Sequence, residues 1–142
     1  MRVDNKVYSK TKANETFAQC YIEECINELD NKMYRYYWFS KTEQSYLSRT
    51  FIMNEGMLAN HLMYNKPERL QQLLDECQLY RYVVRTVRNY EKAVEKQTEK
   101  LCQNDRQMYL AKLADNMDMY YSLEKNNKYR AEEMLRPLLY GE

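Results

Sequence analysis

Residues 67–103 read PERLQQLLDECQLYRYVVRTVRNYEKAVEKQTEKLCQ and carry the clearest periodic pattern in the chain. Apolar side chains recur there at alternating steps of three and four residues, which is the heptad spacing of helices that pack in coiled coils. The seam positions are Leu70, Leu73, Cys77, Tyr80, Val84, Val87, Glu91, Val94, Thr98 and Leu101. Proline is tolerated in the first turn of a helix. The pattern therefore predicts one long helix from about Pro67 to Gln103.

The composition of the 142-residue chain also favours helices, since it holds only 2 Gly and 2 Pro. Nucleotide-binding loops, nucleophile elbows and tight hairpins draw on glycine for backbone conformations with positive φ. All-β folds need a turn every few residues. We therefore expect an all-α protein without glycine-loop chemistry.

Helical signals also precede the long helix. Apolar residues recur every four positions from residue 17 to residue 37, which predicts a first helix with Asn14 as its N-cap. Ser40–Glu43 matches a capping box, in which the serine hydroxyl accepts a hydrogen bond from the Glu43 amide, and predicts the start of a second helix. Gly56 matches the glycine that commonly closes a helix.

After the long helix, Asn104–Gln107 predicts a cap for a further helix. We expect Asn126–Asn127 to break or bend that helix and Pro137 to end the last helical segment. The prediction is a single-domain helical bundle of four to five helices with one long central helix, formed by residues 13–142. A flexible basic tail, residues 1–12, precedes it.

The chain offers few groups for catalysis or metal binding. His61 is the only histidine, and Cys20, Cys25, Cys77 and Cys102 lack the spacing of a zinc motif. We interpret the cysteines as reduced thiols of a cytoplasmic protein. No apolar run approaches the roughly 18 residues of a membrane span. We expect no enzyme, no cofactor, no metal and no membrane segment.

Residues 34–39 form an unusual cluster, because five of the six are aromatic. Consecutive residues of a helix point about 100° apart, so these side chains cannot all face one core. Exposed Tyr and Trp beside an arginine are typical of interface hot spots. The alternative is a plug at the edge of the core. On the first interpretation, the candidate partner-binding residues are Tyr34, Arg35, Tyr37 and Trp38.

A second candidate is the basic ridge, which starts at Arg81, Arg85 and Arg88 and continues through Lys92, Lys96 and Lys100 at steps that keep one helix face. Such a ridge, with Tyr82 and Tyr90 beside it, can follow a phosphate backbone and stack bases. Neighbouring glutamates allow two alternatives, a solvated face with paired charges or a site for an acidic protein.

Three segments resemble the transposon-encoded TnpV-type proteins, which are small helical proteins of mobile elements. Gly56–Leu62 is similar to that family's Gly-x-Leu-x-x-x-Leu segment. Gln107–Met108, and Ala131–Met134 followed by Leu138–Tyr140, resemble its Gln-Met pair and its Ala-Glu-Glu-Ile…Leu-Ile-Tyr ending. The resemblance implies a mobile-element or phage-like origin. It implies no catalytic residues, since the family has no established reaction.

These features together predict a non-enzymatic protein-binding adaptor or inhibitor of mobile-element or phage type, acting through an aromatic and arginine surface. The first alternative is a helical protein that binds nucleic acid through the basic ridge. The second is an oligomeric structural protein, such as a homodimer, paired through the heptad seam. The predicted partner-binding residues are Tyr34, Arg35, Tyr37, Trp38, Arg81, Arg85 and Arg88.

Overall fold

The computed structural model describes residues 2–3, 6–9 and 19–141. These residues form five strands followed by five helices, so the fold is α+β and the prediction of an all-α helical bundle is wrong. The chain divides into two compact units, Met1–Arg85 and Thr86–Glu142, with the boundary inside the third helix. We describe each unit by itself.

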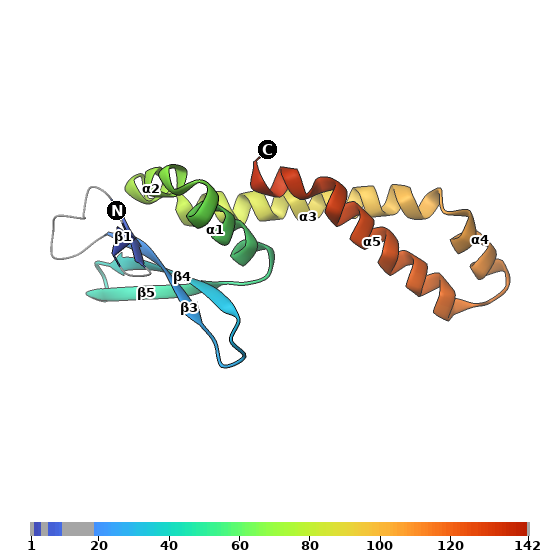
Figure 1. Ribbon diagram of the computed structural model, residues 1–142, viewed down its shortest axis with the longest axis horizontal. Coiled ribbons are helices and arrows are strands. Elements are labelled where there is room, and N and C mark those ends of the chain that lie inside the picture. The colour runs from blue at the N-terminus through green and yellow to red at the C-terminus, as the bar shows by residue number, and fades with distance from the viewer. Residues whose placement is uncertain (1, 4–5, 10–18, 142) are drawn as a thin grey trace. The chain divides into compact units, whose positions relative to one another are not determined.

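The first unit contains a five-stranded antiparallel sheet whose strands lie side by side in the order of the sequence (Figure 1). Its strands are β1 (Arg2–Val3), β2 (Lys6–Tyr8), β3 (Cys20–Ile26), β4 (Lys32–Ser40) and β5 (Ser45–Phe51). Between β3 and β4, Tyr21 pairs with Tyr37 and Ile22 pairs with Tyr36. Because successive side chains of a strand point to opposite faces, Ile22 and Tyr36 lie on one face and Tyr21 and Tyr37 on the other.

The segment predicted as the first helix forms β3 and β4 because its apolar spacing is ambiguous. A step of four residues keeps side chains on one face of a helix, and it does the same on a strand, whose period is two. The composition then favours strands, since β4 reads KMYRYYWFS and tyrosine, tryptophan and phenylalanine are enriched in sheets. The expected N-cap, Asn14, lies outside the described residues.

The turn between β3 and β4 forms without glycine. The side-chain oxygen of Asn27 accepts hydrogen bonds from the amides of Leu29 and Asn31 at 2.9 and 3.0 Å. Asp30 takes the left-handed conformation, with φ of 61°. Asparagine and aspartate tolerate this region and close such turns through their side chains. The scarcity of glycine therefore did not exclude a hairpin here.

The capping-box sequence at Ser40 makes its predicted hydrogen bond, but in a turn. The Ser40 hydroxyl accepts from the Glu43 amide at 3.2 Å. Residues 41–44 connect β4 to β5, so no helix begins here and the predicted second helix is wrong. Serine bonds to nearby backbone amides in turns as it does at helix starts, which makes the two structures alike in sequence.

Helices α1 (Asn54–Asn65) and α2 (Pro67–Asp75) cover one face of this sheet (Figure 1). Gly56 lies in the first turn of α1 rather than at the end of a helix. A Cβ at Gly56 would lie 3.1 Å from the carbonyl oxygen of Phe51, so glycine allows the helix to start this close to the end of β5. The buried side chains of the first unit include Val7, Cys20, Ile22, Tyr34, Tyr36, Phe51, Leu58, Leu62, Leu70, Leu74, Leu79 and Val83.

The predicted long helix is two helices, α2 and α3 (Leu79–Gln103). The start at Pro67 and the end at Gln103 are confirmed, but the chain turns at Cys77, which has φ of 55°. The turn interrupts the predicted seam, whose members Cys77 and Tyr80 are exposed, and the nearby Leu79 and Val83 are buried in their place. Four seam residues, Leu70, Leu73, Val87 and Val94, are already buried within the single chain.

The second unit contains the last part of α3 with α4 (Arg106–Leu113) and α5 (Met117–Tyr140). The cap predicted within Asn104–Gln107 is confirmed, and the capping residue is Asp105, since one carboxylate oxygen accepts from the amides of Gln107 and Met108. The predicted bend at Asn126–Asn127 is wrong, because α5 is continuous there. Pro137 lies inside α5 instead of ending it, and Gly141 closes the helix with φ of 75°.

The predicted basic tail contributes structure in the part that is described. Residues 2–3 and 6–8 form β1 and β2, and Val7 is buried. Residues 1, 4–5 and 10–18 lie outside the described residues, as does the predicted domain start at residue 13. In the described part of the chain, no helix combines the length and the apolar character needed to cross a membrane.

Candidate functional site

The aromatic cluster predicted at residues 34–39 is divided between the two faces of the sheet. Tyr34 belongs to the core, since only 2% of it is exposed and its hydroxyl donates to Asn60 Oδ1 at 2.5 Å. Its proposed role in partner binding is therefore not supported by its position. Arg35 and Tyr37 lie on the opposite face, and Trp38 lies on the same face as Tyr34.

We name the sheet face opposite α1 and α2 the open face. Its residues come from β2, β3, β4 and β5, and antiparallel pairing sets them beside one another. All of them are half-buried except Ser48 of β5, which is exposed. The half-buried residues of the open face include Lys6, Tyr8, Tyr21, Glu23, Arg35, Tyr37, Phe39, Tyr46 and Thr50.

Aromatic rings on the open face contact one another across the strands. The rings of Tyr21 and Tyr37 stack with centroids 4.6 Å apart and planes 13° apart. The ring centroid of Tyr8 lies 5.2 Å from that of Tyr21, and the Tyr46 ring contacts the Tyr21 ring edge-on with centroids 5.3 Å apart. These separations are in the range of favourable aromatic pairs. The rings therefore form one platform, held in place before any partner binds.

Polar groups fix the edge of this platform. The Glu23 carboxylate accepts a hydrogen bond from the Tyr37 hydroxyl at 3.3 Å and pairs with the Lys6 ammonium at 3.5 Å. The Lys6 ammonium also lies 5.3 Å from the centre of the Tyr21 ring. Burial, followed by the nearby Tyr37 and Glu23, raises the pKa of Tyr21 to about 12. The Tyr21 hydroxyl is therefore neutral at physiological pH and can donate or accept a hydrogen bond.

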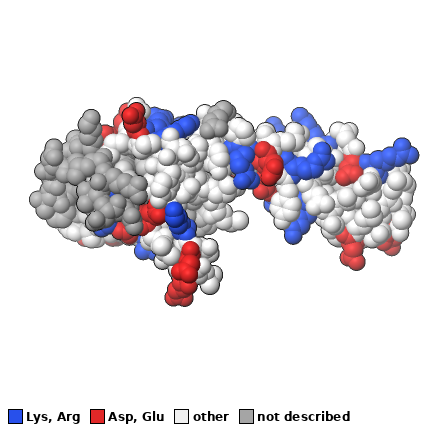
Figure 2. All heavy atoms as spheres, viewed as in Figure 1, with Lys and Arg blue, Asp and Glu red and all other residues white. Residues whose placement is uncertain are grey.

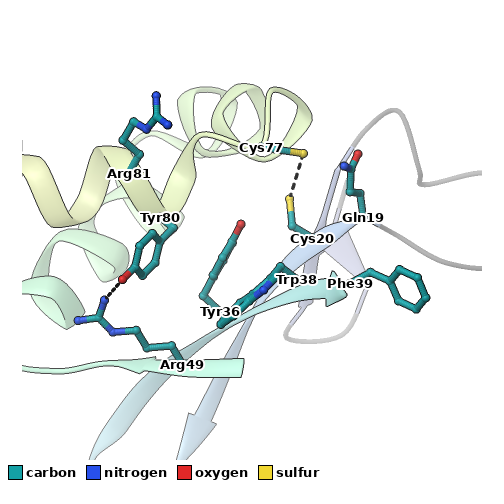
Figure 3. A pocket seen from close by; sticks show the side chains of 9 residues that line it. All are labelled: Gln19, Cys20, Tyr36, Trp38, Phe39, Arg49, Cys77, Tyr80 and Arg81. Carbon is teal, nitrogen blue, oxygen red and sulfur yellow. Dashed lines mark hydrogen bonds between the residues drawn. The ribbon is translucent and has the colours of Figure 1, made fainter. Parts of the chain in front are cut away.

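On the other face, Trp38 and Arg81 line a cavity that we name the aromatic cleft, with a volume of about 540 Å³ (Figure 3). The Tyr36 ring stacks with the Trp38 ring at 5.8 Å and with the Tyr80 ring at 6.1 Å. Figure 3 shows the Phe39 ring pointing away from the other rings. The lining residues are Gln19, Cys20, Tyr36, Trp38, Phe39, Arg49, Cys77, Tyr80 and Arg81.

An arginine and a glutamate hold one wall of the aromatic cleft. Arg49 donates to the Tyr80 hydroxyl at 2.5 Å and forms an ion pair with Glu55 at 2.9 Å. The guanidinium also lies 5.0 Å from the centre of the Tyr80 ring. The charge of Arg49 is thus used within the protein, and Arg81 is the other arginine that lines the cleft.

The basic ridge lies on α3 with its arginines exposed, Arg81 and Arg85 in the first unit and Arg88 in the second. Tyr90, expected to stack bases, is buried and donates its hydroxyl to the Glu132 carbonyl at 3.0 Å. Figure 2 shows basic and acidic side chains interspersed on the face that it presents. The ridge therefore lacks one of its two proposed stacking residues.

The described residues contain no cluster of three or more His, Cys, Asp or Glu side chains with the geometry of a metal site. His61 is buried in α1, and its Nδ1 lies 3.1 Å from the side-chain nitrogen of Asn65.

Arg35 and Tyr37 were predicted from the sequence, but the residues that complete their surface were not. Strand pairing brings Tyr21 against Tyr37, and the rings of Tyr8 and Tyr46 contact Tyr21 in turn. The sequence signal that indicates this surface is the alternation of aromatic residues in β4, since every second side chain of a strand lies on the same face. A search of family models, curated proteins and solved structures found no match to the chain, so the resemblance to TnpV-type proteins stays a prediction.

Proposed function

We propose that the protein is a non-enzymatic protein-binding module, an adaptor or inhibitor, whose binding surface is the open face. The observation that supports this is the platform of Tyr8, Tyr21 and Tyr37, which lies on the side of the sheet that α1 and α2 leave uncovered. Tyrosine supplies a large contact area and a polar group while fixing few rotatable bonds, and tyrosine and arginine are enriched in interface hot spots. Because the rings are already stacked, little conformational entropy is lost when a partner binds.

The polar groups indicate what kind of partner surface fits. Arg35 lies on the open face, where its Nε donates to the Thr50 hydroxyl at 3.4 Å. Apolar partner groups would cover the rings, and carboxylate or carbonyl oxygens would accept from Arg35. The Glu23 carboxylate lies beside the platform and would repel a phosphate bound there. Nucleic-acid sites gain most of their affinity from cationic side chains near the phosphates. This favours a protein partner over nucleic acid.

The test uses the full chain with a photo-crosslinking amino acid at position 37 and, as a control, at position 109. Tyr109 is an exposed tyrosine of α4, in the second unit. We expect one partner protein to be crosslinked from the native host at position 37 and not at position 109. With that partner purified, Tyr37→Ala and Arg35→Ala should each weaken binding by about tenfold or more in calorimetry, the size of a hot-spot effect. Tyr109→Ala should leave binding unchanged.

Two results would replace this proposal. Equal weakening by Tyr37→Ala and Tyr109→Ala would show that the open face has no special role. Tight binding of a single-stranded oligonucleotide, lost at high salt and in Tyr37→Ala, would put nucleic acid in the place of the protein partner.

The proposal extends to a cytoplasmic location and a mobile-element or phage-like origin, the latter from the resemblance of Gly56–Leu62 to TnpV-type proteins. The genes beside the coding sequence test the origin directly. Pairing of two copies is the alternative use of the surface, and sedimentation at two protein concentrations separates a monomer from a homodimer.

A further inference from the structure

We propose that Cys20 and Cys77 form a redox-modification site at the aromatic cleft, where a small-molecule disulfide such as oxidised glutathione converts the two thiols into an intramolecular disulfide. This inference concerns the cleft face of the sheet and does not depend on the function proposed for the open face. It rests on the placement, the exposure and the surroundings of the two cysteines.

The fold brings the two thiols together from distant parts of the first unit. Cys20 begins β3, Cys77 lies in the turn between α2 and α3, and the two are 57 positions apart in the sequence. Their Sγ atoms are 4.0 Å apart (Figure 3). A disulfide has an S–S distance of about 2.05 Å, so the sulfurs must approach by about 2 Å. Cys77 is outside both helices, and a turn can adjust by this amount more easily than a helix or a strand.

The two thiols differ in a way that suits a two-step exchange. Cys77 is exposed, whereas only 1% of Cys20 is exposed. The Cys20 thiol donates a hydrogen bond to the Leu74 carbonyl at 3.2 Å. Burial, and next the nearby Cys77, raises the pKa of Cys20 to about 12. An external disulfide therefore meets Cys77 first, and Cys20 reacts afterwards from inside.

The exchange is balanced in atoms and electrons. The Cys77 thiolate attacks one sulfur of oxidised glutathione, the S–S bond breaks, and one glutathione leaves and takes up a proton. Cys20 then loses its proton to solvent and attacks the Cys77 sulfur of the mixed disulfide, which releases the second glutathione as a thiolate that is protonated in turn. The two cysteines are oxidised by two electrons, and one glutathione disulfide is reduced to two thiols. The second step is intramolecular and is favoured by the high effective concentration of Cys20.

The new bond would change the aromatic cleft, because Cys20 and Cys77 both line it with Trp38. It would tie β3 to the turn that precedes α3, and Tyr80 of that helix stacks on Tyr36 in the cleft. Trp38 is the only tryptophan of the chain, so its fluorescence reports on oxidation without a label.

The experiment equilibrates the full chain in glutathione buffers of increasing oxidation, traps free thiols by alkylation, and measures intact mass and peptide links. The control variant carries Cys25→Ser and Cys102→Ser, which removes the two cysteines whose thiols hydrogen-bond to Met33 and Asn127. We expect wild type and control to lose two alkylation sites together, to yield a Cys20–Cys77 peptide, and to change Trp38 fluorescence at the same buffer ratio. The midpoint should be at least about tenfold more reducing than the ratio at which Cys25 or Cys102 is modified.

Two single variants keep the test decisive even if one of them folds poorly. Cys20→Ser should stop at a glutathione adduct on Cys77, and Cys77→Ser should leave Cys20 free at every ratio that oxidises wild type. Wild type that accumulates the Cys77 adduct without the Cys20 link would overturn the proposal. Modification of Cys25 or Cys102 at the same ratio as Cys77 would overturn it as well.

Discussion

Replacing Ile22 by alanine should destabilise the first unit strongly, while the same change at Ile26 should not. Both isoleucines are in β3, but Ile22 is 0% exposed and Ile26 is 67% exposed. Ile22 pairs with Val7 on one side and Tyr36 on the other, and both of these are buried. In the helix that the sequence predicted, positions 22 and 26 would be one turn apart on the same face. The pair of variants therefore separates the observed sheet from the predicted helix.

The magnitude follows from the atoms removed. Isoleucine has three more carbons than alanine, and each buried carbon contributes about 0.8 kcal/mol, which gives about 2.4 kcal/mol. The cavity that remains adds a further term, so that Ile22→Ala should lower the free energy of unfolding by about 3 to 4 kcal/mol. Ile26→Ala is a surface change and should alter it by less than about 0.5 kcal/mol.

Urea unfolding followed by Trp38 fluorescence measures this difference, because the only tryptophan lies in β4 of the same sheet. The midpoint of Ile22→Ala should fall while the slope with urea stays the same. Equal shifts in the two variants, or a loss below about 1 kcal/mol at Ile22, would refute the placement of β3 in the core.

Three further predictions concern the second unit, each followed by circular dichroism at 222 nm. Asn127→Ala should lower stability by about 2 kcal/mol, because the buried amide donates to the Asp105 carboxylate at 3.0 Å. This hydrogen bond is the largest cause, and bonds from backbone amides are the next, that hold the pKa of Asp105 below its ordinary 3.8. The stabilisation is therefore present above pH 3.8 and is lost as the pH falls through the lower pKa of the folded state. Asp105→Asn should remove this pH dependence, and a dependence that persists would contradict its cause. Tyr90→Phe should lower stability by about 1 kcal/mol through loss of the bond to Glu132, and no change would show that water replaces it.

The second unit shows which features a sequence can predict. Asp105 caps α4, and α3 ends at Gln103, as expected. Both predictions rest on contacts within a few residues of the chain, where sequence spacing determines geometry. The bend expected at Asn127 is absent, because the side-chain nitrogen of Asn127 donates to the Asp105 cap of α4 and the side-chain oxygen accepts from Arg130, so both groups have side-chain partners.

The sheet could not be predicted from the same kind of signal. Glycine scarcity suggested few turns, yet positive φ is adopted by five other described residues, Asp30, Gln44, Met53, Cys77 and Asp115. Two of these, Asp30 and Gln44, lie in the turns on either side of β4. Composition therefore limits glycine-dependent loops, but it does not limit turns that asparagine, aspartate and serine side chains close.

The candidate site was predicted only in part, because strand pairing brings its residues together. Arg35 and Tyr37 were chosen for their chemistry, and they lie on the open face. Tyr8 and Tyr21 join them only through pairing between β2, β3 and β4, which spacing along the chain does not encode. The Cys20–Cys77 contact is non-local in the same way.

The measurement that tests this account most directly is the strand register of β3 and β4 by nuclear magnetic resonance. We predict short Hα–Hα contacts at alternate pairs of the register from Cys20–Trp38 to Ile26–Lys32, with Tyr21 opposite Tyr37. That register sets the tyrosine platform on one face and the aromatic cleft on the other. Contacts between residues three and four positions apart throughout residues 20–38, with no contacts between β3 and β4, would show a helix. That result would contradict both the tyrosine platform and the aromatic cleft.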